Sequence, residues 1–401
     1  MTDSPDTSAT ASAIRVMVVD DSAVIRGLIT RMLEADPEIS VVASVGNGQL
    51  AVNQLERHPK LIDVIILDIE MPVMDGLTAL PLLLKVDPNI KVIMASTLTK
   101  RNAEISLRAL SAGATEYVPK PSTARDLSGG ENDFKRELLN KVKSLGAVHR
   151  SQTGEAIASR PAPAARPAAA VAPAAKPAAP GAKPADAGTL QRWEKRSQAQ
   201  AVMRAAGTTK PDILAVGSST GGPQALFEFF KALPKNINMP VVLTQHMPAT
   251  FTSILAEHIT RMSGWPCTEA KDGDVLEAGK IYLAPGDYHM TVVQKGPQRV
   301  IALNQEPPEN FCRPAVDPML RSVVKVYGAR VLTVILTGMG NDGEKGSQHV
   351  VNAGGTVIAQ DEKSSVVWGM PGAVAAAGLC STLLPVVELA GYAVNYINRT
   401  K

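Results

Sequence analysis

One short turn in the sequence carries residue types that can perform covalent chemistry. The stretch ILAVGSSTGG, residues 213–222, fits the pattern G-x-S-x-G centred on Ser219. This pattern places a serine on a sharp strand-to-helix turn, where glycines relieve crowding between neighbouring Cβ atoms. The next segment, GPQALFEFFKAL, is typical of a helix whose N-terminal N–H groups would face an oxyanion formed at Ser219. A phosphate-binding loop and a purely structural turn are the alternatives.

The ends of two further apolar strands bear on that choice. A dinucleotide-binding loop requires G-x-G-x-x-G and an acid at the end of the second strand, whereas the strand MPVVLTQH ends in His246. Of the six histidines, His258 and His349 lie in helical patterns and are expected to be structural. A third strand, RVLTVILTG, leads into MGNDGEKG, which contains Asp342. Because parallel strands end at one edge of a sheet, the pattern predicts a nucleophile, a general base and an orienting acid side by side.

A second group of reactive residues lies in the N-terminal part of the chain. Asp20 and Asp21 follow its first apolar run, and Asp68 follows the third. Clustered carboxylates are costly unless a hard cation neutralises them, and Mg²⁺ suits such a donor set. The segment STLTK adds hydroxyls after the fourth run, and Lys120 follows the fifth. Such a pocket can accept a phosphoryl group on an aspartate; solvated turn acids are the alternative.

The elements that must position these residues alternate between strand and helix. The runs IRVMVVD, ISVVAS, IDVIILD, IKVIMAS and TEYVPK, separated by helical patterns, predict a flavodoxin-like, doubly wound parallel sheet. In the C-terminal part, three buried apolar strands predict a second, Rossmann-like and mostly parallel sheet. The runs GKIYLAP, YHMTVVQK and QRVIALNQ are closer to alternating and predict an antiparallel hairpin at its edge. The fold class is therefore α/β.

Between the two parts, residues 154–190 consist almost wholly of Ala, Pro, Gly and scattered charges. Proline denies helices and sheets their hydrogen bonds and alanine has little to bury, so an extended, semi-rigid linker is predicted. The expected division is a disordered N-terminus (1–13), a first domain (14–146), a linker (147–208) and a second domain (209–401).

Composition narrows the possible classes of protein. The chain has 401 residues, 45% of them hydrophobic and 20% charged, with a formal net charge of +3, which gives no reason to expect a nucleic-acid partner. Its three cysteines are far apart, which argues against a disulfide framework or a zinc knuckle. The polar start and the lack of a long apolar run predict a cytoplasmic protein without direct membrane insertion.

Residues 14–146 resemble the receiver domain of bacterial response regulators in the segments VVDDS, LDIEMPVMDG, MAST and EYVPKP. The resemblance implies that Asp68 is the phosphoacceptor and that Asp20, Asp21, Asp68 and the main-chain carbonyl of Glu70 hold Mg²⁺. The implied switch and phosphoryl-contacting residues are Ser96, Tyr117 and Lys120. Serine replaces the commoner threonine at the switch position but keeps the hydroxyl.

Over nearly its whole length, the chain resembles the chemotaxis protein-glutamate methylesterase family. The matching segments are GSSTGG, QHMP, YLAPGDYHM, RPAVDPML and LTGMGNDGEKG. The resemblance implies that Ser219 is the nucleophile, His246 the base, Asp342 its partner and the Met339 N–H an oxyanion donor. The residues implied for the substrate cleft are Thr220, an ordering hydroxyl, and Arg313, which would meet receptor carboxylates. The segment WGMPGAV departs from the charged form associated with the family.

The activity implied by this resemblance is that of a phosphorylation-activated serine esterase acting in bacterial chemotaxis. Its partners would be the methylated cytoplasmic domains of chemoreceptors, and a chemotaxis histidine kinase as phosphodonor. Some family members also deamidate receptor glutamines. Mg²⁺ is expected in the receiver and no cofactor in the esterase domain. The residues alone leave open a receiver joined to a binding module, or a different acyl hydrolase.

Overall fold

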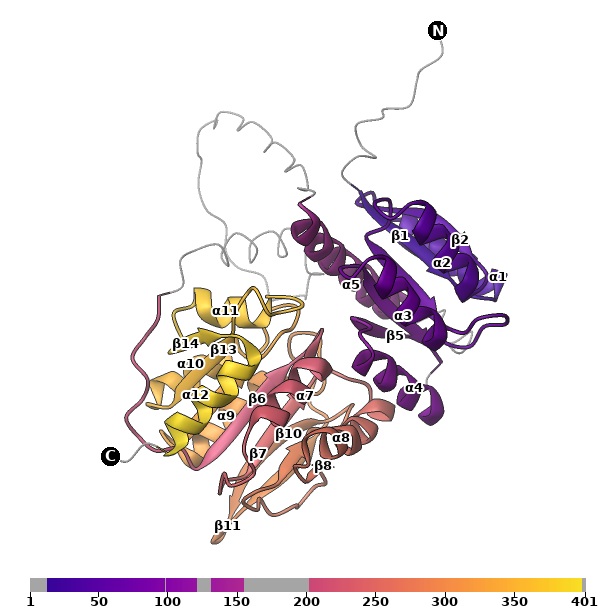
Figure 1. Ribbon diagram of the computed structural model, residues 1–401. Coiled ribbons are helices and arrows are strands. Elements are labelled where there is room, and N and C mark those ends of the chain that lie inside the picture. The colour runs from indigo at the N-terminus through magenta and orange to yellow at the C-terminus, as the bar shows by residue number, and fades with distance from the viewer. Residues whose placement is uncertain (1–12, 98, 121–130, 155–201, 399–401) are drawn as a thin grey trace, which may run out of the picture.

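The computed structural model describes residues 13–97, 99–120, 131–154 and 202–398, and the side chains of 131–133 are outside this description. The expected N-terminal disorder and most of the expected linker therefore fall outside the described residues. Figure 1 shows two α/β lobes side by side, the N-terminal one in purple and the C-terminal one in pink to yellow.

The N-terminal lobe is a five-stranded parallel sheet in the order β2-β1-β3-β4-β5. Helices α1 and α5 pack on one face, and α2, α3 and α4 on the other. The doubly wound, flavodoxin-like prediction is confirmed. Its elements are β1 (Ile14–Val19), α1 (Ala23–Glu34), β2 (Ile39–Val45), α2 (Gly48–Arg57), β3 (Val64–Asp68), α3 (Gly76–Val86), β4 (Lys91–Ser96), α4 (Lys100–Ser111), β5 (Glu116–Pro119) and α5 (Glu131–Thr153).

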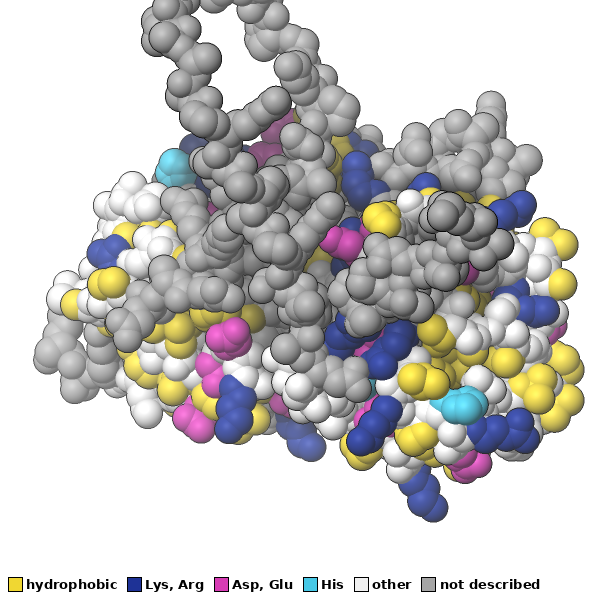
Figure 2. Space-filling model, turned by 90° about the horizontal axis from the view of Figure 1, so that it is seen from above, with side chains coloured by type: hydrophobic (Ala, Val, Ile, Leu, Met, Phe, Trp, Pro, Cys, Tyr) yellow, Lys and Arg dark blue, Asp and Glu magenta, His cyan; other side chains and the backbone are white. Residues whose placement is uncertain are grey.

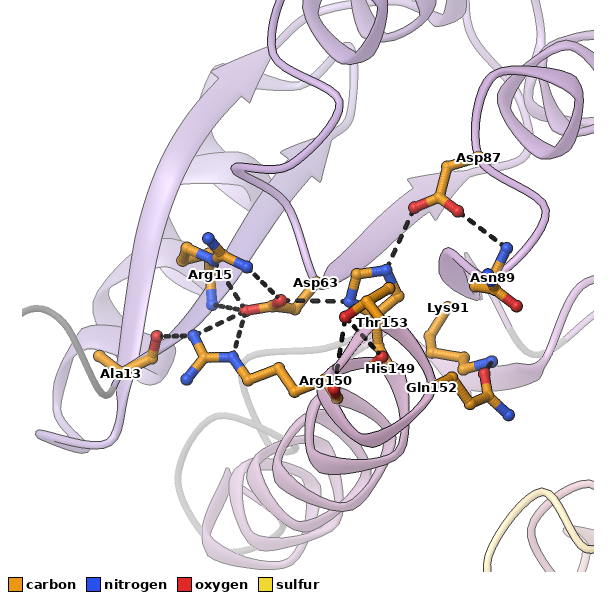
Figure 3. A network of polar contacts seen from close by, with 10 residues as sticks. All are labelled: Ala13, Arg15, Asp63, Asp87, Asn89, Lys91, His149, Arg150, Gln152 and Thr153. Carbon is orange, nitrogen blue, oxygen red and sulfur yellow. Dashed lines mark hydrogen bonds and ion pairs between the residues drawn. The ribbon is translucent and has the colours of Figure 1, made fainter. Parts of the chain in front are cut away.

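A buried ionic network ties the end of α5 to the sheet (Figure 3). Asp63 is fully buried and accepts hydrogen bonds from Arg15 Nη2 at 2.7 Å and Arg150 Nη2 at 2.8 Å. His149 lies between two carboxylates, with Nδ1 3.2 Å from Asp63 and Nε2 3.1 Å from Asp87. This network explains why α5 continues to Thr153, past the boundary at residue 146 expected from the sequence.

The C-terminal lobe is built on a seven-stranded sheet in the order β14-β13-β12-β6-β7-β9-β8, with every pair parallel. Helices α7, α8 and α12 pack on one face, and α9, α10 and α11 on the other. Its strands are β6 (Ile213–Ser218), β7 (Val241–Gln245), β8 (Cys267–Glu269), β9 (Ile281–Leu283), β10 (His289–Lys295), β11 (Gln298–Asn304), β12 (Val331–Ile335), β13 (Thr356–Gln360) and β14 (Thr382–Leu384). Its helices are α7 (Gly222–Ala232), α8 (Ala249–Ser263), α9 (Val316–Tyr327), α10 (Glu344–Asn352), α11 (Met370–Ala376) and α12 (Val386–Asn398).

The predicted hairpin is present but is placed differently. Strands β10 and β11 pair antiparallel and form a separate two-stranded sheet, not an edge of the main one. The run GKIYLAP, expected in that flank, supplies β9, which pairs parallel with β7 and β8. All three residues of β9 are buried, so its short apolar segment fits inside a parallel sheet.

The two lobes share a packed interface. Tyr117 on β5 stacks on Phe251 of α8, with ring centroids 4.3 Å apart and an interplanar angle of 18°. Gln224 Nε2 on α7 donates to the carbonyls of Leu110 and Ala114 at 2.8 and 2.6 Å. In Figure 1, α4 lies against α8 at this junction. The interface thus joins the α4–β5–α5 side of the N-terminal lobe to the second lobe.

The outer surface is mixed in character. On the face seen in Figure 2, outside the grey atoms, Lys and Arg side chains are interspersed with acidic and hydrophobic ones. Among the described residues, no helix combines the length and apolar character needed to cross a membrane.

Candidate active site and phosphorylation site

The sequence-predicted serine, histidine and aspartate follow three adjacent strands. Strand β6, which leads to Ser219, pairs with β7 on one side and β12 on the other. The main chain joins the strand ends directly, because Ser219 N donates to Thr337 O at 3.0 Å and His246 N donates to Ser218 O at 3.2 Å. The parallel sheet therefore brings the three predicted residues to one edge.

The turn around Ser219 requires its small neighbours. Gly221 has φ of 74°, and a Cβ there would lie 2.5 Å from Val366 Cβ. A Cβ on Gly338 would lie 2.9 Å from Ser219 Cβ. Ser218 is fully buried and donates to Gln245 Oε1 at 2.6 Å, whereas Ser219 is half-buried. Ser219 is thus the serine of the pair that keeps some exposure and, among the described side chains, no buried partner.

His246 and Asp342 form a close pair. His246 Nε2 lies 2.7 Å from Asp342 Oδ2. The same carboxylate accepts hydrogen bonds from the backbone N–H groups of Val316 at 2.6 Å and Asp317 at 3.1 Å. Burial raises the pKa of Asp342, but His246 and these donors outweigh it and hold the pKa below its usual range. An ionised Asp342 accepts the Nε2 proton, so Nδ1 is the nitrogen of a neutral imidazole that can act as base.

That nitrogen meets a residue which the sequence analysis did not assign to the site. Cys312 Sγ lies 3.3 Å from His246 Nδ1. Within the described part of the chain, the Ser219 hydroxyl makes no hydrogen bond to His246. Burial lowers the pKa of His246, but Cys312 and Asp342 raise it to about 10. The Cys312 sulfur therefore occupies the position at Nδ1 that a serine hydroxyl would take.

The loop after β12 lies beside the serine. Met339 directly follows Gly338, the residue in contact with Ser219. Among the described residues, no partner accepts a hydrogen bond from the Met339 N–H, so this donor is available to an oxyanion. The Met339 side chain contacts the N-terminal lobe, because Ser144 Oγ on α5 lies 3.3 Å from its sulfur.

The two residues expected in the substrate cleft are differently placed. Thr220 is buried and faces the Glu116 carboxylate of the N-terminal lobe, where it helps to lower the pKa that burial raises. Arg313 Nη1 donates to the carbonyls of Gln305 and Glu306, both at 3.2 Å. In this arrangement Arg313 therefore holds the loop that leads to Cys312.

The predicted acidic cluster lies in the N-terminal lobe, at the ends of strands β1 and β3. Carboxylate oxygens of Asp20, Asp21 and Asp68 lie within 4.8 Å of one another. Lys120 Nζ lies 2.6 Å from both Asp20 Oδ2 and Asp68 Oδ1. Burial raises the pKa of Asp68 and the charge of Asp20 adds to this, while Lys120 lowers it. Three close carboxylates with one lysine leave an excess of negative charge, a donor set that fits a hard divalent cation.

The remaining predicted receiver residues lie on or just after strands β3, β4 and β5. Ser96 ends β4 and its hydroxyl is 3.1 Å from that of Ser106. Tyr117 is buried in the interface between the lobes. Glu70 follows β3, two residues beyond Asp68, with its side chain exposed. The switch candidates therefore extend from the acidic cluster to the surface that meets the second lobe.

The fold joins a receiver-type doubly wound domain to a second, larger parallel-sheet domain, and comparison with known proteins identifies the combination. Residues 16–129 match the response regulator receiver domain, and residues 214–392 match the CheB methylesterase family. A protein-glutamate methylesterase/protein-glutamine glutaminase of Rhodospirillum rubrum is 57% identical, covering 96% of each chain. One from Azospirillum brasilense is 56% identical, covering 98% of this chain and 95% of its own.

Among solved structures, the crystal structure of the Thermotoga maritima CheB methylesterase catalytic domain is 38% identical, covers 47% of this chain and 99% of that chain, and has a TM-score of 0.45. On the strength of the two relatives above, this chain belongs to the protein-glutamate methylesterase/protein-glutamine glutaminase family.

Proposed function

We propose that this chain is a cytoplasmic serine esterase that hydrolyses glutamate methyl esters on chemoreceptors and is activated by phosphorylation of Asp68. The observation that carries the proposal is the His246–Asp342 pair, at 2.7 Å, on the strand ends flanking the Ser219 turn. Relatives that share more than half of its residues are named for this activity and for a glutaminase activity.

The proposed chemistry follows from the groups at the strand ends. Ser219 Oγ attacks the ester carbonyl while His246 Nδ1 takes its proton, and Asp342 stabilises the imidazolium. The Met339 N–H donates to the oxyanion of the tetrahedral intermediate. His246 then gives the proton to the leaving methoxide, which departs as methanol. Water, deprotonated by His246, cleaves the acyl-serine and leaves a glutamate carboxylate. A glutamine substrate would release ammonia by the same steps.

Receiver docking supports control of this chemistry. Contacts from the N-terminal lobe reach three positions beside the proposed catalytic groups: Thr220 through Glu116, Met339 through Ser144, and Phe311 through Arg136, whose guanidinium carbon lies 4.8 Å from the ring centroid. The docked receiver would therefore cover the positions beside the catalytic groups and keep substrate away from them.

Phosphorylation would act through the receiver's own residues. Asp20, Asp21, Asp68 and the Glu70 carbonyl would hold Mg²⁺, which would neutralise the incoming phosphoryl group. Asp68 would accept that group from a histidine kinase, and Lys120 would hold it. Ser96 and Tyr117 would shift in response, and because Tyr117 stacks on Phe251, its movement would loosen the interface.

A fluorophosphonate probe tests the enzymatic assignment directly. We expect the probe to form a covalent adduct on Ser219, located by peptide mass spectrometry, and more rapidly after treatment with acetyl phosphate. A Ser219→Ala protein should remain unlabelled. If the wild-type protein stayed unlabelled under both conditions, a receiver joined to a binding module would be the better description.

A further inference from the structure

Two helices near the proposed active site begin without a cap from their own N-cap residues. These residues are Ala315 before α9 and Gly343 before α10, and neither offers a side-chain hydrogen bond. Asp342 supplies the cap for α9 by accepting from Val316 N and Asp317 N. Asp317 in turn lies on α9 and accepts from Gly343 N at 3.0 Å and Gly346 N at 2.6 Å, at the start of α10. Asp342, which precedes α10, therefore caps α9. Asp317, which lies on α9, caps α10.

Two donors bridge the carboxylates. Asn310 Nδ2 lies 3.0 Å from Asp317 Oδ2 and 2.8 Å from Asp342 Oδ1. Gly343 N donates to both as well, at 3.0 Å to Asp317 Oδ1 and 3.0 Å to Asp342 Oδ1. Because both bridges are shared, a displacement of one carboxylate breaks hydrogen bonds of the other.

The pair also places a second buried negative charge beside the His246 partner. Both carboxylates are almost completely buried, at 1% exposure for Asp317 and 2% for Asp342. Burial raises the pKa of Asp317 and the Asp342 charge adds to this. Arg321, one turn further along α9, offsets part of this charge, although it is itself paired with Glu309. Shared donors and like charge together make the two acids one unit.

We propose that Asp317 and Asn310 are positioning residues that fix Asp342, and through it His246, for the hydrolytic reaction. The inference rests on the proposed roles of Ser219, His246 and Asp342. Neither Asp317 nor Asn310 touches the nucleophile; they act by holding the carboxylate that orients the base.

Replacing Asp317 with Asn keeps the size of the side chain and removes its charge. The oxygen of the new amide accepts from the N–H groups of Gly343 and Gly346. Its NH₂ group then faces the NH₂ group of Asn310, so that two donors oppose each other. We expect kcat to fall on the order of 10- to 100-fold with KM nearly unchanged, because a small misplacement of catalytic groups has effects of this size. Loss of a negative charge also lowers the pKa of His246, so the acid limb of the pH profile should move to lower pH.

Replacing Asn310 with Ala changes the site in a different way. Asn310 is half-buried on a loop, so its truncation should leave the fold intact. The two carboxylates lose one of their two common donors, keep the Gly343 N–H, and keep both charges. We expect a fall in kcat of similar size, with the acid limb moving to higher pH because the negative charge is less compensated. A merely structural role would not shift the two profiles in opposite directions.

The test measures methanol release by the full-length protein with acetyl phosphate present, over a pH series, on membranes containing methylated chemoreceptors. Glu344→Gln is the matched control, because it removes an acid from the first turn of α10 without touching the pair, and it should match the wild type. Circular dichroism melts report folding. If Asp317→Asn does not fold, Asn310→Ala decides the question.

The outcomes separate this inference from the proposal it rests on. If the Ser219→Ala protein still released methanol, the proposed function itself would be overturned. If Ser219→Ala is inactive but the folded Asp317 and Asn310 variants keep wild-type kcat and pH limbs, only the positioning role is overturned. Lowered kcat with the two opposite shifts supports it.

Discussion

His246 presents its base nitrogen to Cys312: Nδ1 lies 3.3 Å from the thiol sulfur, while Nε2 is engaged by Asp342. A serine nucleophile and this thiol therefore compete for the same nitrogen. The contacts with Cys312 and Asp342 also raise the pKa of His246, although burial opposes them.

Cys312→Ala should therefore change the pH dependence of the reaction. Without the sulfur the pKa of His246 falls, so the acid limb of kcat/KM should move to lower pH. Methanol release over a pH series measures this. Cys380→Ala removes the same atom from the core, far from His246 in the contact network, and serves as control. An unchanged acid limb would mean that Cys312 does not control the base.

Weakening the interface between the lobes should raise basal activity. Gln224→Ala removes two hydrogen bonds to the carbonyls of Leu110 and Ala114. Each contributes about 1 kcal/mol, so the undocked fraction should rise about 5- to 30-fold, up to the fully activated level. Methanol release without phosphodonor measures the change. Gln348→Ala loses one hydrogen bond within α10 and should behave as wild type. Equal basal rates for both variants would argue against receiver inhibition.

Magnesium removal should affect activation and leave the basal reaction intact. The acidic cluster that fits the cation belongs to the receiver, whereas the proposed hydrolysis uses only side chains and backbone of the second lobe. We expect EDTA, and separately Asp68→Asn, to abolish stimulation by acetyl phosphate. Loss of the basal rate in EDTA would instead assign the metal a role in hydrolysis.

The ionic network at the end of α5 should contribute strongly to stability. Burial raises the pKa of Asp63, but hydrogen bonds from His149, Arg15 and Arg150 outweigh it and hold the pKa well below its usual range. Asp63→Asn leaves the buried Arg150 without its full charge partner, so the free energy of unfolding should fall by about 3–5 kcal/mol.

The sign of its pH dependence follows from that lowered pKa. Above the ordinary aspartate pKa of 3.8 the wild-type advantage is fully present, and it disappears as the pH falls toward the lowered value. Urea unfolding of the receiver, followed by circular dichroism at pH 7 and pH 3, measures it. Glu34→Gln, an exposed acid on α1, is the control. The difference should be smaller at pH 3 than at pH 7, and an equal difference at the two pH values would contradict the ionic explanation.

Much of the fold followed from strand periodicity. Five apolar runs in the first lobe appear as β1 to β5 in a parallel sheet, because runs buried on both faces carry a strong pattern. The same pattern brought Ser219, His246 and Asp342 to adjacent strand ends. The sequence pattern predicted the β10–β11 hairpin but not its separation from the main sheet. The alternation of side chains along a strand does not indicate which sheet the strand joins.

The loop before α9 escaped sequence reasoning for a related reason. Asn310 and Phe311 adopt positive φ values of 52° and 64°, a backbone path that no apolar pattern specifies. The loop carries Cys312 to His246 and Asn310 to the two carboxylates. The only sequence signal was the position of Cys312 beside the RPAVDPML segment, which the resemblance had assigned to the cleft.

Methanol release from receptor-containing membranes tests the central claim most directly. We predict slow release by the wild-type protein, strong stimulation by acetyl phosphate, and no release by Ser219→Ala under either condition. Ser218→Ala, which alters the buried neighbouring serine, should retain measurable release. Release by Ser219→Ala at the wild-type rate would contradict the assignment of this chain as a serine methylesterase.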